Sequence, residues 1–478
     1  MERILTAEQM RAADNFTIEK LGIAQSELVL RAGKAVAEEI LKKFKGGRAL
    51  VCIGKGNNGA DGRVIADILS KVHGFAVNSI NIDNGLFGLF EKKYDIIVDC
   101  IFGTGLNKSV EGKYLTAIEK INSSGAYVVS CDIPSGLNAD TGLAMGAAVK
   151  ADLTVAIQEY KLGHFINDGK DYCGKVVAKD IGISVWEDDC VKIIGNEEVR
   201  KFFPERNHNV NKGDFGKCAV IGGSKEFTGS SLLSANALAS MKTGVGYAYL
   251  FVPESLLSVY ACKNPEIIVS TVKDENGHMI FDEESLKPAL KFDSVAIGMG
   301  MGKSEETFKI VKYFLENFTG RLLIDADGLN SLSAFGVDVL KTKKCDVILT
   351  PHIGEFSRLL QSDKASFMSD IIAKSKQFAD EFNVTLLVKN AVSVITDGKE
   401  TYINVTGSSG LAKAGSGDVL SGLLCGMLTS HEDAIDVVTA GARLFGRCGE
   451  IAEKEQNVYT MTATDVIKVL PEAINEVL

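Results

Sequence analysis

Short apolar runs alternate with helix-like patterns along nearly the whole chain, and this alternation constrains the fold more than any other feature of the sequence. Runs such as "ALVCIG", "YDIIVDCIF" and "AYVVSCDI" have strand length, and each is followed by a loop that contains Gly, Asp or Pro. Continuous apolar strands separated by helices predict parallel sheets covered by helices on both faces. Ligands of such sheets bind at the carboxyl ends of the strands, so we expect the functional residues in these loops.

The chain has 478 residues, which is too long for a single ordinary core. The alternation lapses over residues 185–211 and starts again with "KCAVIGGS". The sequence therefore predicts two α/β domains, 1–205 and 206–478, an N-terminal Rossmann-like α/β/α sandwich and a C-terminal α/β domain. Residues 7–41 carry a helical pattern, with Met10, Ala13, Thr17 and Leu21 on one face.

Composition limits the class of function. Hydrophobic residues make up 46% and charged residues 24%, as in soluble globular proteins, and the net charge is −10. A negative chain without clustered Lys and Arg is not expected to bind nucleic acid. No run approaches the roughly 20 apolar residues of a membrane span, and "MERILTAEQM" does not resemble a secretory signal. The ten cysteines lack CxxC spacing, which favours reduced thiols in the cytoplasm.

Four glycine-bearing or charged loops of the second half follow expected strands or begin a helix. They are "GGSKEFTGS", "GMGMG", "TPHIGEF" and "AGSGDVLSG". In the last, Gly415 and Gly417 would leave backbone N–H groups free to bind an anion, and Asp418 would lie in the first turn of a helix. Taken alone, this stretch also fits a turn with an acidic residue at a helix N-terminus. Together the loops fit phosphoryl transfer, which needs an anion nest and a base.

The ordered set "GMGMG", "DADGLN", "TPHIGE", "LVKN" and "AGSGD" resembles the ribokinase-like ADP- or ATP-dependent NAD(P)H-hydrate dehydratases. The resemblance runs from Lys212 to the C-terminus and implies the ribokinase-like fold, with Asp418 as the catalytic base. It also implies two sets of binding residues. The hydrated dinucleotide would contact Ala239, Gly300, Gly302, His352 and Asp418, and the adenine nucleotide would contact Lys389, Asn390, Ala391, Val392, Ser393 and Gly417.

Three loops of the first half offer oxygen ligands and glycine-rich backbone. "GKGNNGADG" follows one expected strand, "DCIFGTGLNKS" ends the next and "DIPSGLNADTG" the one after. Carboxylate, amide and hydroxyl oxygens suit a monovalent or divalent cation, and glycines permit close approach of a pyrophosphate. Each loop alone also fits an ordinary turn.

Together with "QMRAAD" and "LVLRAGKAVA", these loops resemble NAD(P)H-hydrate epimerase domains over residues 3–183. The resemblance implies a potassium ion bound by Asn58, Asp99 and Ser135. It implies acid/base catalysis by Asp132, with Lys108 as a charge stabiliser. Ala60 stands where glycine is more frequent, which would tighten the loop if that position needs positive φ. The implied substrate-binding residues are Asn57, Asn58, Gly59, Ala60, Asp61, Gly103, Thr104, Gly105, Leu106, Asn107, Lys108, Ser109 and Asp132.

The two resemblances together imply a bifunctional repair enzyme for hydrated NADH and NADPH. We expect it to use ADP or ATP with magnesium, to bind potassium, and to form a homo-oligomer in the cytoplasm, with no nucleic-acid or membrane partner. Two alternatives stay open at this point. The second domain could be a ribokinase-like kinase of a small alcohol, and the first could be a non-catalytic binding domain like its relatives in RNA metabolism.

Overall fold

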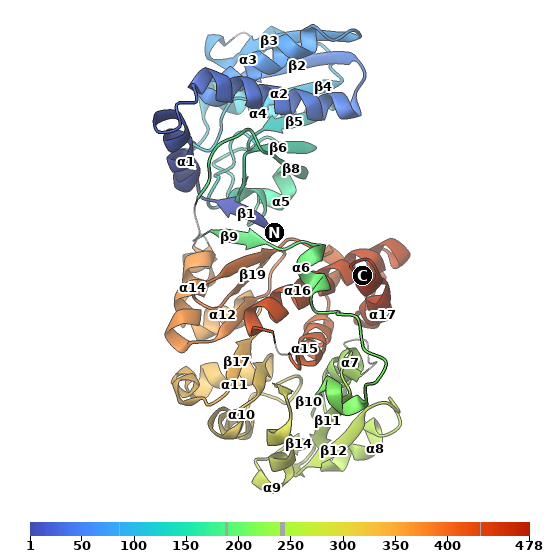
Figure 1. The fold of residues 1–478 in the computed structure, drawn as a ribbon. Coiled ribbons are helices and arrows are strands. Elements are labelled where there is room, and N and C mark those ends of the chain that lie inside the picture. Colours follow the sequence, from blue (N-terminus) through green and yellow to red (C-terminus); the bar gives the residue numbers. More distant parts are fainter. Residues whose placement is uncertain (86, 187–189, 240–243, 369, 431) are drawn as a thin grey trace. The chain divides into compact units, whose positions relative to one another are not determined.

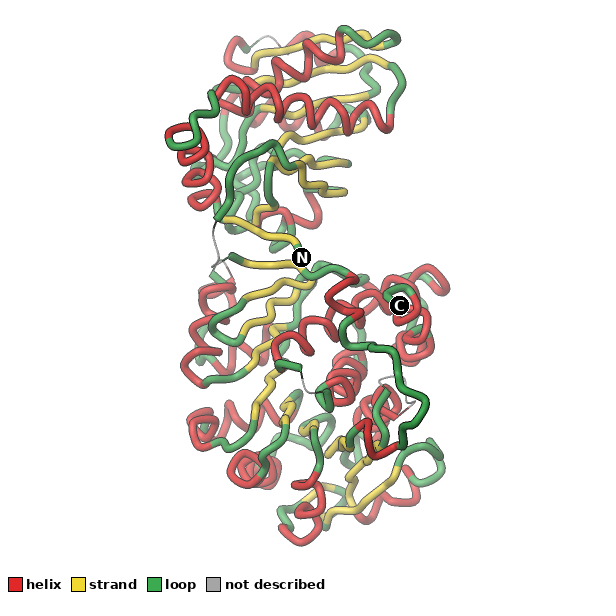
Figure 2. Tube along the Cα trace, in the orientation of Figure 1, coloured by secondary structure: helices red, strands yellow, loops and turns green. Residues whose placement is uncertain are grey.

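The computed structural model describes residues 1–85, 87–186, 190–239, 244–368, 370–430 and 432–478. It divides the chain into two compact units, Glu2–Val191 and Lys192–Leu478, with Met1 grouped with the second. Each unit is an α/β layer structure of its own (Figures 1 and 2). Within the described ranges, no helix is long and apolar enough to cross a membrane.

The first unit is built on a parallel sheet in the order β3-β2-β4-β5-β6-β8. The strands of the unit, which also include the parallel pair β1–β7, are β1 (Glu2–Leu5), β2 (Gly47–Ile53), β3 (Phe75–Asn81), β4 (Ile96–Cys100), β5 (Tyr127–Cys131), β6 (Leu153–Ile157), β7 (Tyr160–Lys161) and β8 (Lys175–Lys179). Its helices are α1 (Ala7–Glu19), α2 (Gln25–Lys43), α3 (Asn57–Ser70), α4 (Gly112–Asn122) and α5 (Gly169–Tyr172).

The alternation of side chains along β2 shows how helices come to cover both faces of this sheet. Val51 and Ile53 share a buried cluster with α2 and α3, whereas Leu50 and Cys52 share another with α4. Because both sets of alternate residues are apolar, both faces must be covered. The expected sandwich is therefore confirmed.

The second unit carries a larger sheet whose order is β12-β11-β10-β15-β16-β17-β18-β19-β20-β9. The strands from β12 to β18 are parallel, and β19 pairs antiparallel with both β18 and β20. They are β9 (Val191–Ile193), β10 (Lys217–Ile221), β11 (Tyr247–Pro253), β12 (Ile268–Val272), β15 (Ser294–Ile297), β16 (Arg321–Ile324), β17 (Asp346–Leu349), β18 (Thr385–Val388), β19 (Ser393–Thr396) and β20 (Thr401–Asn404), with a small hairpin β13 (Asp274–Glu275) and β14 (His278–Met279).

Helices cover both faces of this sheet. Figure 1 shows α10, α11, α12 and α14 on one side of the strands and α7, α15, α16 and α17 on the other. The helices of the unit are α6 (Asn196–Arg200), α7 (Thr228–Ala239), α8 (Leu257–Tyr260), α9 (Glu283–Leu286), α10 (Glu305–Asn317), α11 (Asp327–Phe335), α12 (Ile353–Leu359), α13 (Lys364–Met368), α14 (Ile371–Phe382), α15 (Ser416–Met427), α16 (Ala434–Gln456), α17 (Ala463–Lys468) and α18 (Leu470–Asn475).

Two expectations about element boundaries differ from the structure. The pattern over residues 7–41 is interrupted after α1, where Gly22 has a φ of +71°, and Leu21 is exposed although Met10, Ala13 and Thr17 are buried. The interval 192–205, which we assigned to the first domain, packs in the second unit instead. Lys192 of β9 pairs with Tyr402 of β20, and Val199 of α6 joins the core formed with α16.

Candidate active sites

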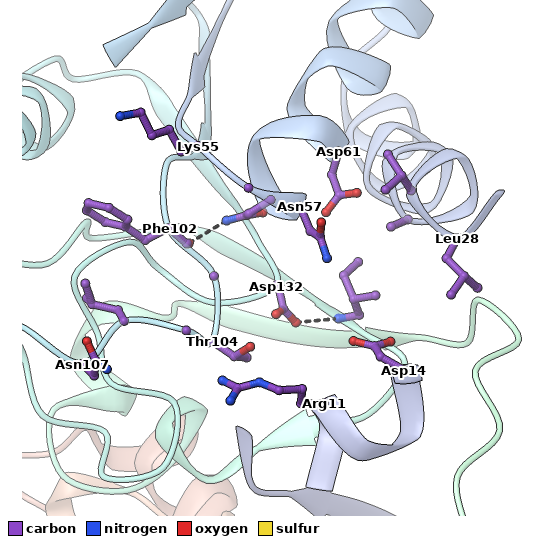
Figure 3. Close-up of a pocket in the computed structure, with 18 of the residues that line it drawn as sticks. Arg11, Asp14, Leu28, Lys55, Asn57, Asp61, Phe102, Thr104, Asn107 and Asp132 are labelled. Carbon is purple, nitrogen blue, oxygen red and sulfur yellow. Dashed lines mark hydrogen bonds between the residues drawn. The ribbon is translucent and has the colours of Figure 1, made fainter. Parts of the chain in front are cut away.

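A pocket of about 960 Å³ lies at the carboxyl ends of β2, β4 and β5 in the first unit (Figure 3). Most residues predicted for the epimerase substrate line it, namely Asn57, Asn58, Asp61, Gly103, Thr104, Gly105, Leu106, Asn107, Lys108, Ser109 and Asp132. The loops at the carboxyl ends of the strands, where ligands of parallel sheets bind, therefore bring these residues to one pocket. Residues of α1 and α2 that the sequence analysis did not single out also line the pocket, among them Arg11, Asp14 and Leu28.

The start of α3 brings the backbone close to the neighbouring strand ends. Gly56 caps the helix with a φ of +89°, a conformation that glycine adopts without strain. A Cβ on Gly59 would lie 1.9 Å from the Gly54 carbonyl oxygen, so this glycine is required for packing and does not line the pocket. Ala60 does not line the pocket either, and it lies in α3 with ordinary helical backbone. Position 60 therefore does not need positive φ, and the glycine of this loop with positive φ is Gly56.

The residues expected to bind potassium lie together beneath the pocket. Asp99 is fully buried and accepts hydrogen bonds from Ser135 Oγ (2.6 Å), Ser135 N (2.8 Å) and Ser130 Oγ (3.0 Å). Asn58 Nδ2 donates to the Phe102 carbonyl oxygen at 2.6 Å, while the buried Asn58 Oδ1 has no hydrogen-bond partner. An unpaired buried oxygen is costly unless something satisfies it. Among the described residues, no three His, Cys, Asp or Glu side chains form a metal cluster.

Asp132 projects into the pocket from a strained position directly after β5. Its φ is +67°, and its side chain is 17% exposed. Oδ1 accepts hydrogen bonds from the Ile157 backbone N–H (3.1 Å) and from Lys161 Nζ. His164 Nδ1 accepts from the Lys161 N–H, so its Nε2–H is free to donate to the Asp132 carbonyl oxygen at 2.7 Å. Burial and the charge of Lys161 lower the pKa of His164 to about 4, which keeps the ring neutral.

Two more carboxyl groups, Asp14 of α1 and Asp61 of α3, converge on the pocket near Asp132 (Figure 3). Burial, with repulsion from Asp132 and Asp14, raises the pKa of Asp61 to about 8. Burial also raises the pKa of Asp14 to about 6, against the opposing charge of Lys161. Asp14 and Lys161 were not predicted as site residues. Asp14 ends the "QMRAAD" stretch and follows the buried Ala13 of α1. This position was the one sign in the sequence that Asp14 could reach the pocket.

In the second unit, the "GSGD" turn begins α15 as expected. Gly415 is the N-cap with a φ of +93°, and Asp418 follows in the first turn. Ser230 Oγ of the neighbouring helix α7 donates to Asp418 Oδ1 at 2.6 Å. Burial, reinforced by the charge of Asp325 and opposed by the Ser230 hydrogen bond, raises the pKa of Asp418. Asp418 is thus a positioned carboxyl group with a strengthened affinity for a proton.

A buried ion pair lies beside this helix start. Lys389 Nζ lies 2.8 Å from Asp325 Oδ1, and Ser421 Oγ of α15 donates to Asp325 Oδ2 at 2.6 Å. A Cβ on Gly417 would lie 3.3 Å from Lys389 Nζ, so the helix N-terminus and the lysine are adjacent. Lys389 and Gly417, two of the residues predicted to bind the nucleotide, therefore lie next to each other. Asn390, Ala391 and Val392 lie in the turn between β18 and β19, and Ser393 is the first residue of β19.

His352 serves first as a helix cap. Its Nδ1 accepts hydrogen bonds from Gly354 N (2.9 Å) and Glu355 N (3.3 Å), and its side chain is 56% exposed. Burial and repulsion from Asp325 raise the pKa of Glu355 to about 7. The other ring nitrogen, Nε2, lies 3.6 Å from Glu355 Oε1. His352 and Lys389 are neighbours, because residues 352 and 389 are bridge partners.

Gly300 and Gly302 both have positive φ, +68° and +83°, as a tight glycine loop requires. A Cβ on Gly300 would lie 2.8 Å from Phe227, and Gly302 N donates to Asp327 Oδ2 at 2.8 Å. The loop therefore packs against "GGSKEFTGS" and the start of α11. Ala239 ends α7, and its side chain lies outside the described structure.

These features define a two-unit α/β protein, in which a Rossmann-like unit with a carboxylate-lined pocket precedes a ribokinase-like unit with an aspartate at a glycine-rich helix start. The comparisons specify the family. A family model described as NAD(P)H-hydrate dehydratase matches residues 218–472, and one described as YjeF-related protein N-terminus matches 25–86 and 78–163. The chain belongs to the bifunctional NAD(P)H-hydrate repair enzymes.

Relatives and a solved structure agree with this assignment. The chain is 33% identical to the bifunctional NAD(P)H-hydrate repair enzyme Nnr of Archaeoglobus fulgidus, over 98% of each chain. It is 29% identical to the enzyme of the same name from Dictyoglomus turgidum, over 100% of this chain and 99% of the relative. The ADP/ATP-dependent NAD(P)H-hydrate dehydratase from Bacillus subtilis, co-crystallised with ATP and Mg²⁺, is 26% identical with a TM-score of 0.52 and covers 60% of this chain and 99% of its own.

Proposed function

We propose that this chain repairs hydrated NADH and NADPH with two activities, an epimerase in residues 2–191 and an ADP- or ATP-dependent dehydratase in residues 192–478. The observation that carries the proposal is the presence of two separate positioned aspartates in one chain of this family. Asp132 faces a pocket in the first unit, and Asp418 stands at a helix N-terminus in the second. This family assignment disfavours both the small-alcohol kinase and the non-catalytic first domain.

In the dehydratase, Asp418 would take the proton from the hydroxyl group that water added to the nicotinamide ring. The hydroxyl oxygen then attacks the terminal phosphorus of ADP, the bond from that phosphorus to AMP breaks, and a phosphate ester forms. Phosphate is a better leaving group than hydroxide, so breaking the ring C–O bond and losing a proton from the adjacent carbon restores NAD(P)H. The N-terminus of α15 and Lys389 would stabilise negative charge on the phosphates.

Binding residues for this reaction are proposed from the loops that meet near Asp418. Gly300, Gly302, His352 and Ala239 would contact the hydrated dinucleotide, and Lys389 to Ser393 with Gly417 would contact the adenine nucleotide. Mg²⁺ usually binds through substrate phosphates and few carboxylates, so we propose that it enters with the nucleotide. Bound there, it would neutralise phosphate charge during the transfer.

In the epimerase, Asp132 would handle the proton as the hydroxyl-bearing carbon inverts, through ring opening or a transient iminium. Lys108 lines the same pocket and would stabilise charge on the substrate. Asn57, Asp61 and residues 103–109 would hold the dinucleotide. The S epimer formed in this way supplies the dehydratase, so a mixture of both epimers is consumed.

We propose potassium as the cation of the first unit, bound by Asn58, Asp99 and Ser135. The fit is supported by Asn58 Oδ1, a buried oxygen without a hydrogen-bond partner, and by Phe102, whose backbone bonds both Asn58 and Ser135, the latter a partner of the Asp99 carboxylate. A large monovalent cation accepts mixed carboxylate, amide and hydroxyl oxygens. When bound, it would balance the buried charge of Asp99 and fix the loops at residues 58, 102 and 135. We further propose a cytoplasmic homo-oligomer without nucleic-acid or membrane partners.

The function is tested by incubating the full chain with both epimers of hydrated NADPH, ADP or ATP, and magnesium, and following nicotinamide absorbance. We expect complete return of NADPH, faster than spontaneous epimerisation allows. No return with either nucleotide contradicts the dehydratase. Return that stops near half of the hydrate contradicts the epimerase.

A potassium titration tests the cation site without using activity. Binding to the folded state alone stabilises a protein by about 2.7 kcal/mol at 100 times Kd. Replacing sodium by potassium should therefore raise the thermal midpoint of the first unit in the wild-type chain. Asn58→Ala should remove this effect, because it deletes the unpaired oxygen.

The matched control for the potassium titration is Asn57→Ala. Asn57 lines the pocket and accepts a hydrogen bond from Gln25 Nε2 at 2.8 Å. This variant should keep the potassium response. Equal midpoints in potassium and sodium for the wild-type chain would exclude the site.

A further inference from the structure

A fully buried lysine, Lys161, lies directly behind the pocket of the first unit. Its side chain is 1% exposed, at the end of the two-residue strand β7. A lysine is almost never fully buried unless it is paired. Its Nζ donates to Asp132 Oδ1 and, at 2.8 Å, to the Ile157 carbonyl oxygen. Lys161 therefore does not line the pocket itself, but it contacts two residues that do, Asp132 and Ile157.

Other hydrogen bonds of the same turn hold the backbone of Asp132. His164 lies in the 3₁₀ turn Leu162–His164 that follows Lys161, and its Nε2–H donates to the Asp132 carbonyl oxygen. The Asp132 N–H donates to Val155 O at 2.9 Å. A non-glycine residue at a φ of +67° stays there only if its surroundings hold it. The turn Lys161–His164 thus fixes both the carboxylate and the backbone of one pocket residue.

The carboxyl groups of the pocket outnumber the single positive charge of Lys161. Three carboxyl groups face the pocket near it, Asp14 from α1, Asp61 from α3 and Asp132 after β5. Glu159, just before β7, pairs with Arg3 of β1 at 2.8 Å, and His164 is neutral. Lys161 bonds only one of the three pocket carboxyl groups directly, and Asp61 has its pKa raised to about 8. The lysine therefore holds Asp132 by direct contact, whereas its charge acts on Asp14 through space, where it opposes the raised pKa of that group.

We propose that Lys161 is a positioning residue for epimerisation, which holds the Asp132 carboxylate aimed into the pocket and does not touch the substrate itself. The inference rests on the proposed epimerase activity. It assigns the proton-handling group of that reaction to Asp132. Asp61, which lines the same pocket and whose pKa burial raises to about 8, is the carboxyl group that would supply a proton.

The test uses Lys161→Met in the full chain, with isolated epimers and no nucleotide, so that only interconversion is followed, by chromatography. The spontaneous rate is subtracted. We expect the epimerase kcat near neutral pH to fall about 10- to 100-fold, part of what general acid–base catalysis contributes. KM should be nearly unchanged, because Lys161 does not line the pocket. Lys161→Arg, which keeps a charged donor at this position, should retain more of the rate than Lys161→Met.

Lys179→Met is the matched control. Lys179 lies on β8 of the same unit, pairs with Glu39 and does not line the pocket. It should leave kcat and KM unchanged. If Lys161→Met does not fold, Lys161→Gln, which keeps a donor but no charge, should give the same fall in kcat with KM nearly unchanged.

The outcomes separate this inference from the function on which it rests. A wild-type chain without epimerase activity contradicts the proposed function. A folded Lys161 variant with the wild-type kcat overturns the inference alone. A variant whose KM rises as much as its kcat falls also overturns it, because the lysine would then shape the pocket as a whole and not position Asp132.

Discussion

Replacing Asp418 by Asn should slow dehydration about 10²- to 10⁴-fold and leave epimerisation unchanged. This is the contribution expected of a positioned general base. Asn keeps the shape of the side chain and can still accept the Ser230 hydrogen bond, so the start of α15 should be preserved. Burial raises the pKa of Asp418, so the wild-type rate should begin to fall on acidification at a higher pH than an exposed aspartate would cause. NADPH absorbance with the S epimer and ADP measures both effects.

Asp436→Asn is the control for Asp418→Asn. Asp436 also lies in the first turn of a buried helix, α16, in the same unit. Its replacement should leave dehydration within a factor of two or so, as is usual for substitutions away from a site. If Asp418→Asn keeps more than about a tenth of the wild-type rate, the base must be another group. Glu355, whose pKa is raised to about 7, would then be the first to examine.

Much of this arrangement could be predicted because it depends on local sequence. Apolar runs of four to seven residues between Gly, Asp and Pro gave β2, β4, β5, β10, β15 and β16, and the strand-end rule then brought their loops together. Asn57 and Asp132 reach one pocket for this reason, although 75 residues separate them in the chain. The glycine-rich start of α15 was likewise visible from Gly415 and Asp418.

What could not be predicted depends on contacts between distant residues or on a weak local pattern. β3, "FAVNSIN", is the edge strand of the first sheet and is only partly buried, so polar residues interrupt its apolar pattern. Lys161 follows a strand-like run as an ordinary charged residue, and only the fold places it beneath Asp132. The domain boundary was placed 14 residues late because β9 is three residues long and is defined by its pairing with β20.

Replacing Asp132 by Asn should slow epimerisation by about 10²- to 10⁴-fold, while the second unit continues to dehydrate the S epimer. Asn is the appropriate replacement because position 132 has a φ of +67°, which Asn tolerates better than Ala. The amide can still accept the Ile157 N–H hydrogen bond that holds the side chain. The variant therefore removes the carboxylate charge with the least change of backbone.

The decisive measurement gives the Asp132 variant both epimers with excess ADP and magnesium. Absorbance should rise in a fast phase equal to the S fraction and then only at the rate of spontaneous epimerisation, whereas the wild-type chain completes the rise in the fast phase. The matched control is Asp171→Asn, an exposed aspartate of α5 in the same unit, which should behave as the wild type. A fast phase that consumes all of the hydrate in the Asp132 variant would remove this residue from the reaction. Because the dehydratase works in the same chain, a wild-type rate of the fast phase also shows that each variant protein is folded in its second unit.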